Sequence, residues 1–64
     1  DDLSRIRGIG PVLEKQLNDL GIYTFQQIAD FNEQQIDRID AHIRFPGRVL
    51  RERWIEQARQ FIGR

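Results

Sequence analysis

A short glycine-rich turn near the start of the chain constrains its fold more than any other feature. Gly8 and Gly10 flank Ile9, and Pro11 follows directly. Glycine allows backbone angles and close approaches that a Cβ would prevent, and proline suits the first turn of a helix because its missing N–H is not needed there. We expect Ile9 to point inward and hold the flanking segments together. The turn therefore predicts two helices joined by a tight connection.

The remainder of the chain predicts more helix and no strand. Apolar residues recur at helical spacing, and the expected helices cover about 3–6, 11–20, 25–30, 33–42 and 47–62. Two of these helices begin with a capping box, formed by Thr24 with Gln27 and by Asn32 with Gln35. The fold class predicted is all-α, with five short helices.

The last of these helices is expected to be continuous and the longest. Pro46 separates it from the preceding helix, because the residue before a proline avoids helical geometry. Leu50, Trp54, Ala58 and Phe61 recur on one face, which predicts that all four are buried.

Length and composition limit the classes of protein to which the chain can belong. Its 64 residues allow one domain, spanning 1–64, with a thin core. The chain starts with Asp1 and has no methionine, which suggests a piece cut from a longer protein. It has no cysteine, which weakly favours the cytoplasm. There is no signal-peptide pattern and no apolar run long enough to span a membrane.

No set of residues predicts catalysis. The one histidine, His42, has no cysteine or second histidine to complete a metal site, and Ser4 has no histidine near it in sequence. A domain of this size also has little volume for a pocket that excludes water. We therefore expect no enzyme activity, no catalytic residue, no metal, no cofactor and no small-molecule substrate.

The charges are balanced in total but unevenly distributed. The formal net charge is +0, yet residues 1–40 carry four basic and eight acidic groups, whereas residues 41–64 carry six arginines and two glutamates. Interleaved acids favour a solvated, salt-bridged last helix, with Arg48 pairing to Glu52 and Glu56 to Arg59. The acid-free stripe is the better candidate for a surface that faces an anion, and it consists of Arg53, Gln57, Gln60 and Arg64.

The glycine turn is also the best candidate for a binding site. It leads into a helix N-terminus, where unpaired N–H groups and the helix dipole favour a phosphate. Arg5, Arg7 and Lys15 are near enough in sequence to add positive charge. The alternative is that Gly8 and Gly10 serve only the geometry of a tight turn.

From Ile6 to Pro11 the chain resembles the helix-hairpin-helix family, in which two such turns are paired through a connecting helix. Residues 24–40 look like the connecting region, and residues 45–49 take the place of a second hairpin that lacks a Gly-x-Gly. Together with Phe45-x-Gly47-Arg48 and Trp54-x-x-Gln57-Ala58, these features are most similar to a small bacterial group. Its members extend a large-subunit ribosomal protein, a respiratory NADH:quinone oxidoreductase subunit and uncharacterised proteins, and it implies a SAM-like bundle.

The resemblance implies binding to the phosphate backbone of nucleic acid without reading its sequence, as in the DNA-binding members. Gly8 and Gly10 would donate N–H groups, and Arg7 and Lys15 would support them. The chain departs from those members at Glu14, where many have a small residue and where a carboxylate would repel phosphate. The complete expected contact set is Arg5, Arg7, Gly8, Ile9, Gly10, Lys15, Arg48 and Arg53.

Two functions therefore remain open. The first is an accessory module that binds duplex DNA or structured RNA. The second is a protein–protein docking module attached to a larger host complex, which the complementary acidic and basic parts of the chain would suit. A self-associating spacer is a third interpretation, although we expect a monomer.

Overall fold

The structure, a computed structural model, describes residues 1–43 and 46–63, and in these ranges it contains helices and no strand. The elements in chain order are the 3-10 helix η1 (Leu3–Arg5) and the α-helices α1 (Pro11–Asp19), α2 (Phe25–Ala29), α3 (Glu33–Asp40), α4 (Arg48–Arg51) and α5 (Trp54–Phe61). The predicted all-α class is confirmed.

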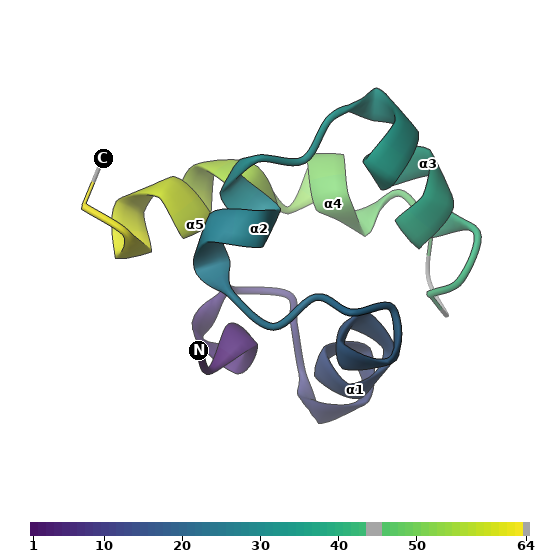
Figure 1. Cartoon of the computed structure of the whole chain (residues 1–64), viewed down its shortest axis with the longest axis horizontal. Helices are drawn as coiled ribbons and strands as arrows, with labels where there is room; N and C mark the ends of the chain where they lie inside the picture. The colour runs from purple at the N-terminus through teal and green to yellow at the C-terminus, as the bar shows by residue number, and fades with distance from the viewer. Residues whose placement is uncertain (44–45, 64) are drawn as a thin grey trace.

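The helices are arranged around α2, which packs against α5 (Figure 1). In Figure 1, η1 and α1 lie below this pair, and α3 contacts α4 at the other end of the molecule. Each of the two hairpins therefore joins a pair of short helices: η1 to α1, and α3 to α4. Residues 20–40, which include α2 and α3, connect them.

The predicted capping boxes are both present. The Thr24 hydroxyl accepts the Gln27 N–H at 3.1 Å, and the Gln27 side chain accepts the Thr24 N–H at 3.0 Å. In the same way, the Asn32 side chain accepts the Gln35 N–H at 2.9 Å, and the Gln35 side chain accepts the Asn32 N–H at 3.0 Å. These reciprocal bonds satisfy N–H groups that a helix start otherwise leaves unpaired, so helices as short as α2 and α3 have defined beginnings.

The prediction of one continuous helix over 47–62 is wrong. The helix stops after Arg51, and α5 starts at Trp54. Arg53 between them adopts a left-handed conformation with φ 56° and ψ 47°. This break rotates α5 relative to α4, so Trp54 is fully buried while Leu50, which a continuous helix would place on the same face, is 67% exposed.

The core is a single cluster of buried apolar side chains to which every helix contributes. Trp54 is the largest fully buried residue, and Ile9 is only 3% exposed, so its predicted inward orientation is confirmed. Phe61 lies at the edge, 37% exposed, with its ring stacked on Phe25 at 4.7 Å between centroids. Of the helices in the described ranges, none is both long and apolar enough for a membrane crossing.

Candidate nucleic-acid interface

Gly8 is a glycine because two features of the fold require it. Its φ of +103° lies in a region that other residues rarely adopt. A Cβ at this position would also collide with the Glu52 carboxylate and lie 3.0 Å from Nε1 of Trp54. The segment that we call the glycine hairpin, residues 7–11, therefore lies directly against the junction of α4 and α5.

A side chain from α5 holds the glycine hairpin in this position. Gln57 accepts the N–H of Arg7 with Oε1 at 2.8 Å and donates from Nε2 to the Arg7 carbonyl at 3.1 Å. The same Nε2 donates to the carbonyl of Glu52 at 2.8 Å. Gln57 therefore joins the glycine hairpin, the junction and α5, and the side chain of Arg7 is left exposed beside them.

Gly10 is different, because the fold does not require a glycine there. Its φ of −96° is accessible to any residue, it is exposed, and no atom lies within 4 Å of where its Cβ would be. It is the N-cap of α1 and has no side chain to cap the helix. The N–H groups of Gly10, Val12 and Leu13 form no hydrogen bond with another described residue. The N-terminus of α1 is therefore open to an acceptor from outside the protein.

Three arginines gather beside the glycine hairpin. They line a surface groove, which we call the arginine groove, formed by Arg7, Arg51, Glu52, Arg53, Gln57 and Gln60. The single carboxylate in it, Glu52, is paired with Arg48 on the preceding turn at 3.4 Å. The arginine groove thus has a net positive charge and glutamine side chains for further hydrogen bonds. Such a surface fits the phosphodiester backbone of a nucleic acid.

The arginine groove contains three residues of the predicted acid-free stripe and one arginine that was not predicted. Arg53, Gln57 and Gln60 of the predicted acid-free stripe do lie together, whereas Arg64 lies outside the described residues. Arg51 was missed, because in a continuous helix it does not share that stripe. The break at Arg53 brings it in, and the alternating Arg51-Glu52-Arg53 sequence contains no signal of this.

The structure distributes the other expected contact residues over several places. The Arg5 guanidinium lies 4.7 Å from the centre of the Phe61 ring, and Arg48 pairs with Glu52, so both have partners inside the protein. Ile9 is in the core, and its N–H donates to the Ile6 carbonyl. Lys15 is exposed on α1. The second predicted ion pair, Glu56 with Arg59, is absent from the described part of the chain.

Glu14, the departure from DNA-binding members, has a structural partner. Its Oε2 accepts the N–H of Leu3 at 2.9 Å, which ties the start of η1 to α1. The side chain is half-buried. The carboxylate is therefore held by a hydrogen bond to the protein's own backbone.

The second hairpin differs from the first in a way that matches its sequence. The N–H of Gly47, where α4 begins, donates to the Asp40 carboxylate at 3.1 Å. An acidic side chain thus takes the place that a phosphate would need, and α4 is a single turn. Phe45, which the sequence analysis assigned to this hairpin, lies outside the described residues.

The described residues contain no cluster of three or more His, Cys, Asp or Glu side chains that could hold a metal ion. His42 is exposed at the end of α3, and its Nδ1 is 2.9 Å from the Arg38 carbonyl.

A tight glycine hairpin between short helices, joined through two capped helices to a second and degenerate hairpin, defines a helix-hairpin-helix domain. The open N-terminus of α1 and the arginine groove lie on either side of its glycine hairpin. The chain belongs to the RS2/RL21/YNQ2 HHH domain family, whose pattern matches residues 3–62.

Relatives of the chain include ribosomal subunit proteins. The chain is 44% identical over 62 residues to the small ribosomal subunit protein uS2 of Methylobacterium sp. (strain 4-46), covering 97% of the chain and 18% of the relative. It is 45% identical over 60 residues to the large ribosomal subunit protein bL21 of Roseobacter denitrificans, covering 94% and 28%. The bL21 of Jannaschia sp. (strain CCS1) is 46% identical over 63 residues, covering 98% and 24%. No solved structure matches the chain.

These matches confirm the predicted family and its occurrence on a large-subunit ribosomal protein, and they add a small-subunit protein that the sequence analysis did not name. The chain spans 18% to 28% of the length of these relatives.

Proposed function

We propose that this domain is an accessory RNA-binding module that holds the phosphate backbone without reading base sequence, as one domain of a longer protein. The observation that carries the proposal is the arginine groove beside the open N-terminus of α1. Three guanidinium groups and three free N–H groups can donate hydrogen bonds to phosphate oxygens. Such contacts are the same for every base sequence.

RNA is proposed as the nucleic acid because the relatives are ribosomal subunit proteins, and ribosomal subunits are built on RNA. A ribosomal host would also place the domain in the cytoplasm. The degenerate second hairpin supports a one-sided contact with a single backbone, since Asp40 occupies the Gly47 N–H that a second strand would use.

The contact set proposed here is narrower than the one expected from sequence. It retains Arg7, Gly10, Lys15 and Arg53 and adds Arg51. Arg5 and Arg48 have internal partners, Ile9 is buried, and Gly8 serves the packing against the α4–α5 junction.

The test is an amide chemical-shift titration of the domain with an RNA stem-loop and with duplex DNA of equal length at low salt. Shifts should concentrate on Gly10, Val12, Leu13 and the α4–α5 junction. About three phosphate contacts predict that the logarithm of affinity falls with the logarithm of salt with a slope of about −2 to −3.

Single substitutions sharpen the test. Arg51→Gln and Arg53→Gln should each weaken binding for every RNA sequence and reduce the salt slope by about 1. Arg59→Gln on the exposed part of α5 is the matched control, since it removes the same charge outside the arginine groove. If all three variants lose RNA affinity equally, the loss reflects net charge alone and the arginine groove is not the binding site.

The second candidate function is protein docking within the host complex. Leu50 is 67% exposed and shares a shallow depression with Ile36 and the carboxylates Glu33 and Asp37. An exposed leucine between acids fits a basic partner protein with an apolar contact residue. Leu50→Ser would separate the two functions, because loss of a protein partner with unchanged RNA affinity favours docking.

A further inference from the structure

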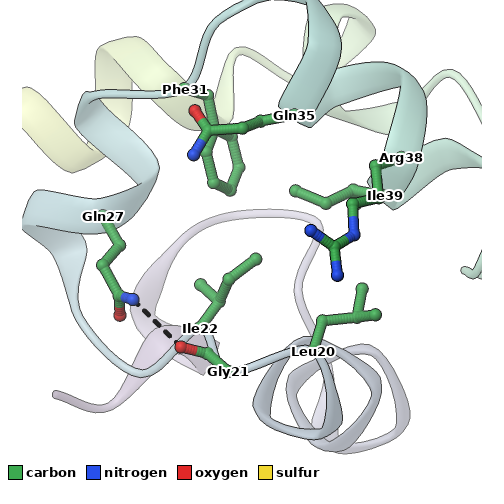
Figure 2. Close-up of a pocket in the computed structure, with 8 residues that line it drawn as sticks. All are labelled: Leu20, Gly21, Ile22, Gln27, Phe31, Gln35, Arg38 and Ile39. Carbon is green, nitrogen blue, oxygen red and sulfur yellow. Dashed lines mark hydrogen bonds between the residues drawn. The ribbon is translucent and has the colours of Figure 1, made fainter.

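A pocket on another face of the molecule has a chemistry that the proposed RNA contact does not use. It lies between the end of α1, α2 and α3 (Figure 2), and its apolar lining comes from Leu20, Ile22, Phe31 and Ile39. Its volume is about 150 Å³. This volume is enough for one apolar side chain.

Four hydrogen-bond acceptors at the rim of this pocket already accept N–H groups of the protein. The Gly21 carbonyl accepts Nε2 of Gln27 at 2.9 Å, and the Ile22 carbonyl accepts Nδ2 of Asn18 at 2.8 Å. The side-chain oxygen of Gln27 accepts two N–H groups at the start of α2, at 2.7 and 3.0 Å. The side-chain oxygen of Gln35 accepts the N–H of Asn32, the N-cap residue of α3, at 3.0 Å. These four oxygens therefore have less capacity left for the N–H donors of a ligand.

The donors at the rim are not in use. The Arg38 guanidinium and the Nε2 group of Gln35 form no hydrogen bond or ion pair with another described residue. Figure 2 shows the guanidinium reaching over the pocket toward Leu20, with the Gln35 amide on the side of Phe31. The pocket therefore combines four apolar side chains with one cation and one amide donor, a pattern that matches an apolar group next to a carboxylate.

We propose that this pocket binds the C-terminal residue of a partner polypeptide, with an apolar side chain inside and the terminal carboxylate on Arg38 and Gln35. A C-terminal residue carries both groups on one Cα and ends in acceptors. An internal residue lacks the terminal carboxylate that would pair with Arg38. The pocket is separate from the arginine groove, so this proposal does not depend on RNA binding.

The probe for this proposal is the peptide N-acetyl-Ala-Ala-Leu with a free carboxylate, compared with the same peptide as a C-terminal amide. In an NMR titration of the domain, the free acid should shift Ile22, Phe31, Ile39 and the Arg38 Nε resonance in a saturable manner. It should bind about tenfold more tightly than the amide, because a hydrogen bond to a charged group is worth more than one to a neutral group. N-acetyl-Ala-Ala-Ala should bind more weakly than the leucine peptide.

Arg38→Gln removes the cation from an exposed position and should lower the affinity of the free acid to that of the amide. Arg59→Gln is the matched control and should leave the affinity unchanged. Equal binding of acid and amide, an unchanged affinity in Arg38→Gln, or no saturable shift up to about 10 mM peptide would each overturn the proposal. Variants of Arg51 and Arg53 should leave peptide binding intact, so the two sites fail separately.

Discussion

Gln57 on α5 hydrogen-bonds to both the N–H and the carbonyl of Arg7, fifty residues earlier in the chain. The pair works as a one-residue clamp, because the amide of glutamine presents a donor and an acceptor just as a neighbouring backbone would. It fixes the glycine hairpin against α5 and orients the Arg7 side chain toward the arginine groove. The geometry of the candidate RNA contact thus depends on a bond between the two ends of the sequence.

Removal of this clamp should cost stability. Gln57→Ala leaves the Arg7 N–H and two carbonyls without their partner, and we expect a loss of about 2 kcal/mol in the free energy of unfolding. Urea unfolding monitored by circular dichroism measures it. Gln60→Ala, in the same groove but on an exposed side chain, should change stability by less than about 0.5 kcal/mol. Similar losses in the two variants would show that the clamp has no special energetic role.

The two glycines of the hairpin should respond differently to alanine. Gly8→Ala forces a positive φ on alanine and places its Cβ against Glu52 and Trp54, so stability should fall by at least about 2 kcal/mol. Gly10→Ala has an allowed φ and open space, and should cost less than about 1 kcal/mol.

The same pair separates folding from binding. Gly10→Ala should keep the fold and weaken RNA affinity, because its methyl group would stand beside the open N–H groups of α1. Thermal unfolding and RNA titration of one sample provide both readouts. If Gly10→Ala leaves the RNA affinity unchanged, the N-terminus of α1 does not contact the RNA.

Substitution of Arg53 by glycine should change stability and RNA affinity in opposite directions. A left-handed conformation costs an ordinary residue about 1–2 kcal/mol, and glycine avoids this cost. After allowance for the greater entropy loss of glycine, Arg53→Gly should raise stability by about 0.5–1 kcal/mol and lower RNA affinity. Arg59→Gly inside α5 should instead reduce stability by about 1 kcal/mol. A destabilised Arg53→Gly would contradict the assignment of strain to this residue.

The start of η1 should give a small acid-sensitive contribution to stability. The Ser4 hydroxyl and N–H both donate to Oδ1 of Asp2, and the hydroxyl is the main reason that the pKa of Asp2 lies below its ordinary value of 3.8. Because the folded pKa is lowered, this contribution is complete above the ordinary pKa and is lost as pH falls through the lowered one.

Ser4→Ala should therefore raise the pKa of Asp2 toward 3.8, measured by NMR titration of the side-chain carboxyl group. Ser4→Thr retains a hydroxyl and should leave the pKa low. If Ser4→Ala titrates like the unmodified chain, the hydroxyl is not the cause of the shift.

Structural features that depend on neighbouring residues are predictable from the amino-acid pattern. The capping boxes at Thr24 and Asn32 were predictable because each consists of hydrogen bonds within a few residues. The glycine hairpin and the inward Ile9 were predictable from the local glycine pattern, and the fold adds distant contacts that hold the hairpin in place. The Arg48–Glu52 pair follows from helical spacing in the same way.

The break in the last helix, and the set of residues that lie around it, follow from long-range contacts. No local signal predicts a left-handed Arg53, because arginine favours a continuous helix. The stabilisation that offsets this conformation comes from distant contacts. Trp54 enters the core, Glu52 lies against Gly8, and Gln57 hydrogen-bonds to Arg7. The same rotation exposes Leu50 and brings Arg51 into the arginine groove. Burial and hydrogen bonds across fifty residues outweigh a local cost, and for this reason helix periodicity located the helical region but not the site.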